Sequence, residues 1–269
     1  MQRIKFFLWL LPSILMPSTF SKNDEKSTVL FCYGKVKAET IKNYTYAILE
    51  PLNYNSAAIK TIKKTNKNVL AYISLGEVNS QAKHYKELKD IVLGKNNNWD
   101  SYYLDLKSEK TKKTLLSLFD DAFEKGFDGM FLDNIDNFTQ FGPQKADKNE
   151  LIAFLKLMNK KYPGKIFFQN AGLELLDQTN QFIDGVVVES VASSFTFKDK
   201  KYSLRDKKEF ENYIKRINDL KSKFKTRFVL VEYADTKSLY DKIVNRLKKH
   251  NLDYFIGKID LQTIPNFKK

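Results

Sequence analysis

Apolar and polar residues alternate along the chain in blocks of two kinds. Short, nearly continuous apolar runs rich in Val, Ile, Phe and Tyr are bounded by turn residues, which is the pattern of buried parallel strands. Eight such runs are present, at residues 29–33, 44–50, 68–74, 129–134, 165–170, 185–190, 227–233 and 254–259. We therefore predict eight strands in a parallel sheet covered by helices.

Longer segments lie between these runs, and in them apolar residues recur every three to four positions before a Gly, Pro or Asn. The segments with the clearest pattern predict helices over residues 108–126, 149–164, 207–224 and 238–251. Eight strands alternating with helices in about 240 residues is the content of an α/β protein of the (β/α)8 TIM-barrel type. An open, doubly wound parallel sheet is the alternative fold. No G-x-G-x-x-G turn follows any predicted strand, which excludes a nucleotide-binding protein of that fold.

Two connections are longer than a barrel needs. Residues 75–128 contain an extra strand-like piece, "YYLDL", and residues 191–205 are expected to form a polar loop with several aromatic side chains. Long loops at the functional face of a barrel are where ligands usually bind.

The length of 269 residues fits one domain, and we expect a monomer. The net charge of +14 raises the alternative of a surface that binds nucleic acid or anionic wall polymers. The lysines, however, are spread over helix-like segments and not gathered in one tail, which favours a solvated lysine-rich surface. We therefore predict no nucleic-acid partner.

The N-terminus has the features of an export signal. Arg3 and Lys5 precede an apolar stretch, and small residues allow cleavage near Ser21. We predict a signal peptide over residues 1–21, a TIM-barrel domain over residues 22–269, and a location that is secreted, periplasmic or at the cell surface. No stable membrane insertion is expected after cleavage, and an uncleaved anchor is the alternative.

Three residues limit the chemistry of the protein. Cys32 is the single cysteine and lies in an apolar run, so a buried structural role is expected and an internal disulfide is excluded. His84 and His250 are the two histidines, and both lie in lysine-rich, helix-like segments. A histidine-based metal cluster cannot be assembled from them, and we predict neither a metal nor a cofactor.

Acidic, amide and aromatic side chains occur where the predicted strands end. In a (β/α)8 barrel the C-terminal strand ends form one rim, so these residues would meet around one cavity. They are Tyr33, Glu50, Ser74, Glu77, Asp133, Asp136, Asn170, Glu189, Glu232 and Tyr233. Carboxylates without histidines suit glycoside hydrolysis, in which one carboxyl protonates the leaving oxygen and a second attacks the sugar or activates water. A Mg²⁺ or Ca²⁺ site is a weaker alternative, because no phosphate-binding loop accompanies the acids.

Some of these acids also have structural interpretations. Asp128 precedes its strand and is expected to shape the "FDG" turn. Asp136 could cap the next helix or belong to the site. Asp133 and Glu189 each follow an apolar run, where an unpaired buried carboxylate would be costly, and their repetition on several strands points to function.

Four segments, "VLAYISLGEVN", "GFDGMFLDNIDNF", "FFQNAG" and "DGVVVES", resemble in this order glycoside hydrolase family 114. These are the endo-α-1,4-polygalactosaminidases and related barrel domains of exopolysaccharide-processing hydrolases, and the resemblance covers residues 29–260. It implies a (β/α)8 fold, export, and cleavage of polysaccharides that contain galactosamine or N-acetylgalactosamine. Glu50 departs from the aspartate expected at the second strand end.

The resemblance also implies roles for particular residues. Asp133 of "LDNID" would be the nucleophile and Glu189 of "VVVES" the acid/base of a retaining mechanism. The sugar site would be lined by Tyr72, Ser74, Glu77, Asp136 and Asn170. A non-hydrolytic barrel that only binds carbohydrate is the alternative function. In either case Phe195, Phe197 and Tyr202 could stack on sugar rings or simply pack their loop onto the rim.

Overall fold

The computed structural model describes residues 28–267, so the predicted signal peptide lies outside the described residues. Eight strands form one parallel sheet and follow one another in chain order, which confirms the predicted fold class. They are β1 (Val29–Cys32), β2 (Tyr46–Leu49), β3 (Asn68–Ser74), β7 (Gly129–Asp133), β8 (Ile166–Asn170), β9 (Gly185–Glu189), β12 (Arg227–Tyr233) and β13 (Asp253–Gly257).

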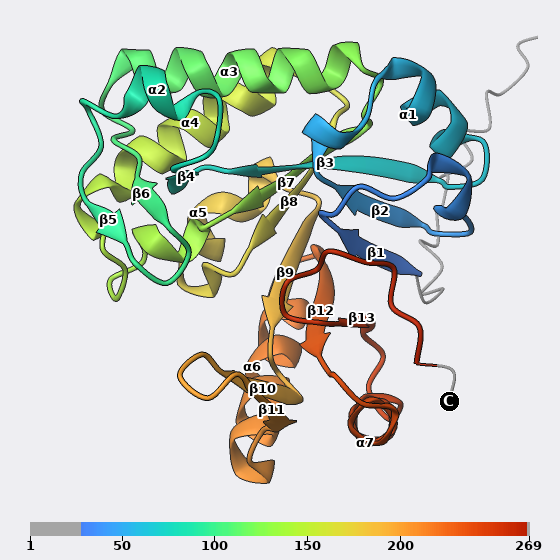
Figure 1. The fold of residues 1–269 in the computed structure, drawn as a ribbon. Coiled ribbons are helices and arrows are strands. Elements are labelled where there is room, and N and C mark those ends of the chain that lie inside the picture. Colours follow the sequence, from blue (N-terminus) through green and yellow to red (C-terminus); the bar gives the residue numbers. More distant parts are fainter. Residues whose placement is uncertain (1–27, 268–269) are drawn as a thin grey trace, which may run out of the picture.

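The sheet curls into a nearly closed barrel (Figure 1). Its two edge strands, β1 and β13, meet through side chains and through the segment that follows β13. The rings of Phe31 and Phe255 lie 5.6 Å apart, and the Tyr33 backbone N–H donates to the carbonyl oxygen of Leu261 at 2.7 Å. The strand ends therefore share a common rim, as the prediction requires.

Helices cover the outside of the barrel (Figure 1). They are α1 (Ser56–Lys63), α3 (Glu109–Glu124), α4 (Lys148–Lys161), α5 (Leu176–Thr179), α6 (Lys207–Lys223) and α7 (Lys237–Leu247). The four predicted helices are thus confirmed. Ser108, Asp206 and Thr236 begin three of them by accepting hydrogen bonds from backbone N–H groups of the first turn. After β1 the chain forms only the short 3₁₀ turn η1 (Ala38–Thr40).

The barrel interior is filled by aromatic side chains. Phe31 on β1 contacts Phe131 on β7 at 5.3 Å between ring centroids, although β2 and β3 separate these strands in the sheet. This contact therefore crosses the interior. Nearer the N-terminal strand ends, Tyr46 on β2 contacts Phe168 on β8 at 4.8 Å. Since the interior is packed at these levels, as in barrels generally, a ligand has access only from the C-terminal rim.

Two insertions rise from this rim. The first arm (residues 77–103) follows β3 and contains β4 (Glu77–Asn79), α2 (Tyr85–Leu88), β5 (Lys95–Asn96) and β6 (Ser101–Tyr103). Its three strands form a small antiparallel sheet, so the extra strand-like piece predicted in this connection is present.

The second arm (residues 193–204) follows β9 and is a hairpin of β10 (Ser193–Thr196) and β11 (Lys201–Leu204). The expectation of a loop over residues 191–205 was wrong. Phe195 pairs directly with Tyr202 across the hairpin, and such aromatic pairs stabilise two-stranded ribbons.

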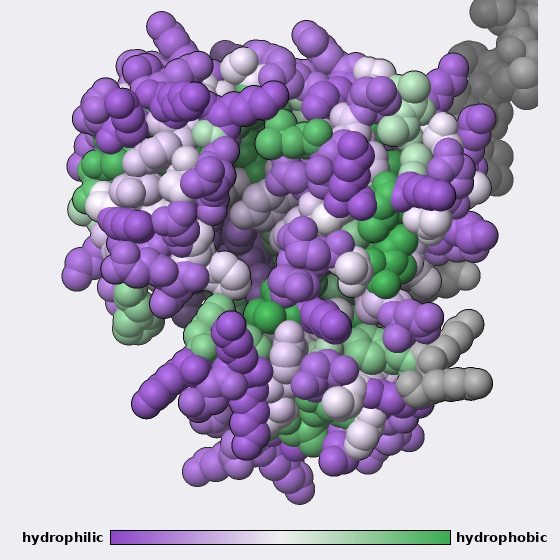
Figure 2. Space-filling view, viewed as in Figure 1, coloured by the Kyte–Doolittle hydropathy of each residue, from purple (hydrophilic) through white to green (hydrophobic). Residues whose placement is uncertain are grey.

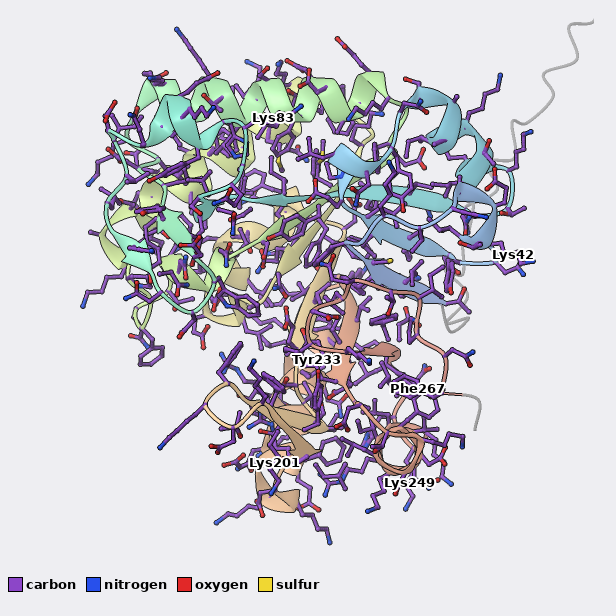
Figure 3. The ribbon with its side chains drawn as sticks, in the orientation of Figure 1. Lys42, Lys83, Lys201, Tyr233, Lys249 and Phe267 are labelled. Atoms are coloured by element: carbon purple, nitrogen blue, oxygen red, sulfur yellow. The ribbon has the colours of Figure 1, made fainter. Side chains whose placement is uncertain are left out.

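The outer surface is rich in solvated lysine. Figure 3 labels Lys42, Lys201 and Lys249 at the periphery, whereas Tyr233 at the end of β12 lies further inward. The single cysteine, Cys32, is buried and free, as expected from its apolar run. Within residues 28–267, no helix combines the length and apolar character needed to cross a bilayer.

Candidate active site

Three consecutive strands of the barrel end in polar residues that face one another. β7 ends in Asp133, β8 in Asn170 and β9 in Glu189. Each is followed by a residue with left-handed backbone: Asn134 (φ 61°), Ala171 (φ 55°) and Ser190 (φ 56°). This conformation costs about 1–2 kcal/mol for a residue with a Cβ atom. Strain of this kind gathers at functional sites, and here it turns the chain sharply away from the rim.

Asn170 connects the two carboxylates. Its side-chain Nδ2 donates to Oδ1 of Asp133 at 2.8 Å and to Oε1 of Glu189 at 2.7 Å. Because one nitrogen binds both oxygens, these oxygens lie within about 5.5 Å of each other, the separation found in retaining glycosidases. The Asn170 residue that forms the bridge is buried, whereas Glu189 at one end of it is exposed to solvent.

Asp133 accepts two further hydrogen bonds. The Tyr72 hydroxyl donates to Oδ2 at 2.8 Å, and the Asn134 backbone N–H donates to Oδ1 at 2.8 Å. Burial raises the pKa of Asp133, while Asn170, Tyr72 and the Asn134 N–H act in the opposite direction because they stabilise the carboxylate. The charged form of Asp133 is therefore well supplied with donors.

Glu189 has fewer donors, since among residues 28–267 only Asn170 and the Tyr233 hydroxyl donate to it. Water reaches its side chain, yet the protein around the rim displaces much of its solvent and raises the pKa of Glu189. The negative charge of Asp133 raises it further. This is the environment of a carboxyl that keeps its proton longer than an exposed glutamate.

Tyr33 and Glu50 complete the opposite side of the mouth. The rings of Tyr33 and Tyr72 lie 4.5 Å apart, and burial together with the charges of Asp133, Glu189 and Glu50 raises the pKa of Tyr33. Glu50 accepts a hydrogen bond from the Leu52 N–H at 3.1 Å, at the start of the 3₁₀ turn η2 (Pro51–Asn53). Burial raises the pKa of Glu50.

Ser74 and Asp136 border the same mouth. The Ser74 hydroxyl donates to Oδ1 of Asn134 at 2.5 Å and accepts from the Glu77 N–H at 2.8 Å, so it fixes the chain around the site. Asp136 lies in η3 (Ile135–Phe138), whose N-cap position is occupied by Asn134. Its side chain is exposed, and desolvation and the charge of Asp133 raise the pKa of Asp136.

Glu77 lies close to the mouth but is engaged by the first arm. Its carboxylate accepts hydrogen bonds from the side chains of Asn96 at 3.1 Å, Asn137 at 3.0 Å and Ser101. The residue before it, Gly76, has no room for a Cβ atom, which would approach Asn137 Nδ2 to 2.8 Å. Glu77 thus anchors the arm, where the sequence suggested a sugar ligand.

Glu232 does not face the mouth, contrary to expectation. It is fully buried and accepts from the N–H groups of Val191, Ala192 and Ser193 at 3.2, 2.9 and 2.7 Å, and from the Ser193 hydroxyl at 2.5 Å. Burial raises the pKa of Glu232 to about 7, against the effect of these donors. Successive strand residues point to opposite faces of a sheet, so Glu232 and its neighbour Tyr233 cannot both line the lumen.

Asp128 lies at the other end of β7, away from these residues. It accepts from the Val69 N–H at 2.9 Å and pairs with Lys63 at 2.6 Å, so it ties the start of β7 to β3 and α1. This is a structural position, in keeping with the interpretation given to Asp128 from sequence. Across the described part of the chain, no group of three or more His, Cys, Asp or Glu side chains is arranged to hold a metal ion.

One residue near the mouth was missed in the sequence, namely Trp99 at the tip of the first arm. It is one of the two tryptophans of the chain and lies in the polar turn "NNNWDS". A large aromatic residue in such a turn, where no buried segment needs it, was the available signal.

A parallel barrel with carboxylates gathered at its C-terminal rim is an architecture that glycoside hydrolases use. Residues 28–267 match the sequence profile of glycoside-hydrolase family GH114. The chain belongs to this family and is a glycoside hydrolase, which confirms the resemblance found in the sequence.

The chain is similar to three further proteins at low sequence identity. MJ1477, an uncharacterized protein of Methanocaldococcus jannaschii, is 24% identical over 280 residues, which cover 94% of this chain and 79% of that protein. The glycoside hydrolase domain of PelA from Pseudomonas aeruginosa superposes with a TM-score of 0.79 at 21% identity, over 90% of this chain and 98% of that one. The structure of Ega3 from Aspergillus fumigatus, solved with galactosamine, superposes with a TM-score of 0.70 at 15% identity. The superposition covers 90% of this chain and 94% of that one.

Proposed function

We propose that the protein is an exported hydrolase of polysaccharides that contain galactosamine or N-acetylgalactosamine, with Asp133 as nucleophile and Glu189 as acid/base of a retaining mechanism. The observation that carries this proposal is the Asn170 amide, which binds both carboxylates and so keeps them close enough for direct attack. The two roles follow from the two environments.

Asp133 has more hydrogen-bond donors than Glu189 and is the better-stabilised anion, whereas Glu189 lies beside that negative charge and retains its proton. In the first step Asp133 attacks the anomeric carbon, the glycosidic bond breaks, and Glu189 transfers its proton to the leaving oxygen. In the second step Glu189 takes a proton from water, whose oxygen attacks the anomeric carbon and releases Asp133.

The charge of the mouth supports an aminosugar substrate. Glu50, Asp133, Asp136 and Glu189 form no ion pair with a lysine or arginine in the described part of the chain, whereas many acids on the outer surface are paired. Unpaired carboxylates attract the ammonium group of a non-acetylated galactosamine at short range. Cleavage of the predicted signal peptide removes Arg3 and Lys5, which lowers the net charge from +14 to +12. A protein of this charge would repel a fully cationic polymer at long range. A partly acetylated chain keeps some ammonium groups for the acidic mouth and carries less positive charge to be repelled.

The proposal is tested by incubating the protein with galactosamine polymers of defined acetylation and measuring new reducing ends, with products identified by mass spectrometry. Partly acetylated polymers are expected to be cleaved, and proton NMR should show products that first appear with the anomeric configuration of the substrate. Chitosan of matched acetylation, the glucosamine counterpart, is the control and should be cleaved far more slowly. Binding without products, or a preference for chitosan, would contradict the proposal.

A further inference from the structure

The tips of the two arms carry half-exposed aromatic side chains that contact each other. Trp99 lies in the turn between β5 and β6 and is 51% exposed, and Phe197 follows β10 and is 49% exposed. Their ring centroids are 5.1 Å apart, and the ring planes meet at 89°. A single exposed apolar side chain is ordinary, but two exposed rings in contact form a continuous apolar surface, which is the kind of feature that marks a binding site.

This contact joins elements that leave the barrel at separate strands. The first arm follows β3 and the second follows β9, and the sheet order places β7 and β8 between them. Figure 2 shows a hollow on this face, beside the region of the first arm. The pair Trp99 and Phe197 therefore spans the side of the rim where Asp133 and Asn170 end their strands.

The aromatic surface continues from this pair along the second arm. Phe195 contacts Phe197 at 5.2 Å and Tyr202 at 4.8 Å between ring centroids. The Tyr202 hydroxyl accepts a hydrogen bond at 3.2 Å from the N–H of Ile259, just after β13. The row thus leads from the tips of the arms back to the body of the barrel.

Buried glutamates hold the bases of both arms. Glu77 binds Asn96 and Ser101, which flank the turn that carries Trp99. Glu232 binds the backbone of Val191 to Ser193, where the second arm begins. The tips are therefore positioned from below while their rings stay accessible to solvent.

We propose that Trp99 and Phe197 form a sugar-binding arch that holds a residue of the polymer away from the cleaved bond. Because the two rings meet edge to face, ring faces remain free for the C–H groups of a pyranose. They are also placed for cation–π contact with the ammonium of a non-acetylated aminosugar, which is strongest over tryptophan. The arch would favour long chains over short ones, since a short oligosaccharide fills only the mouth.

This inference rests on the proposed function and is tested on long and short substrates in parallel. In Trp99→Ala and Phe197→Ala, kcat/KM for a long galactosamine polymer should fall about 3- to 5-fold through KM, the size of one cation–π contact at a solvent-exposed site. In the double variant, which loses two such contacts, the fall should be about 10- to 25-fold. For the shortest oligosaccharide that the wild type cleaves, kcat/KM should stay within about twofold, because exposed side chains outside the mouth are removed.

Phe141→Ala is the matched control, because Phe141 is an exposed phenylalanine outside the arch at 80% exposure and should leave both values unchanged. Trp99→Phe should recover most of the polymer activity, and thermal unfolding should show that every variant is folded. Equal losses on polymer and oligosaccharide, or no loss on either, would overturn the arch while leaving the proposed function intact. If the wild type cleaves no galactosamine polymer, the proposed function fails, and polymer binding by wild type and the double variant then decides the arch alone.

Discussion

The barrel mouth and the bases of the two arms use the same kind of residue, an acid at or just after a strand end, for different purposes. At the mouth, Asp133 and Glu189 share one donor, form no ion pair within residues 28–267, and are each followed by a residue with left-handed backbone. At the arm bases, Glu77 and Glu232 are buried and each accepts from three or more donors, which include residues of the arm that it holds. The origin of the hydrogen-bond donors, not their number, separates the two kinds of carboxylate. At the mouth the donors come from residues around the rim, whereas at the arm bases they include residues of the arm itself.

The sharpest test of this comparison is to remove charge at the mouth. Asp133→Asn and Glu189→Gln should each lower kcat on the polymer by about 1,000-fold or more, since each deletes a group that acts on the reacting bond. Urea unfolding should show stability equal to or above that of the wild type, because a neutral amide avoids the cost of burying a carboxylate charge at either position. Asp128→Asn is the control, because Asp128 belongs to the same sequence motif but lies at the far end of β7, and this variant should keep its activity. If Asp133→Asn or Glu189→Gln kept a tenth of the wild-type activity, the assignment of Asp133 and Glu189 as the catalytic pair would be wrong.

Removing the bridge should have the next largest effect. Asn170→Ala is expected to lower kcat by about 100-fold, because the carboxylates lose the group that aligns them. Asn170 lowers the pKa of both carboxyls, so its loss should raise both pKa values and move both limbs of the pH profile of kcat/KM to higher pH.

Asn68→Ala is the control for the bridge, because Asn68 makes a similar bond, to the Thr45 carbonyl oxygen at 3.0 Å, at the other end of the barrel. It should leave the pH profile in place. A loss of rate in Asn170→Ala without movement of either limb would mean that Asn170 serves packing only.

Changes at the arm bases should affect stability and leave the chemistry nearly intact. Glu232→Ala is expected to lower the free energy of unfolding by about 2–4 kcal/mol, because three buried backbone N–H groups lose their acceptor. Glu77→Ala should cost less, about 1–3 kcal/mol, because its partners are side chains that can turn toward water. Urea unfolding measures these free energies. For both variants, kcat on a short oligosaccharide should stay within about tenfold of wild type. A loss of kcat as large as that expected for Glu189→Gln would show that Glu232 or Glu77 takes part in the reaction.

Much of this organisation could be predicted from sequence, and the exceptions have physical causes. The strands and main helices followed from apolar periodicity, and Asp133, Asn170 and Glu189 could be identified because each ends a buried strand. The end of β12 was located correctly, but Glu232 and Tyr233 were both assigned to the mouth, whereas successive residues of a strand point to opposite faces of the sheet. Trp99 was overlooked because its importance comes from a contact with Phe197, nearly a hundred positions along the chain.

The sequence by itself determined the barrel, its family and which acids lie near strand ends, since these depend on local periodicity and on short motifs. Only the tertiary structure decided which acids meet, because that depends on strand register, on the face to which each side chain points, and on contacts between distant segments. The stretch "GFDGMFLDNIDNF" illustrates both. Its aspartates are close in sequence, yet they serve at opposite ends of the barrel. Asp128 pairs with Lys63 at one end, and Asp133 shares a donor with Glu189 at the other.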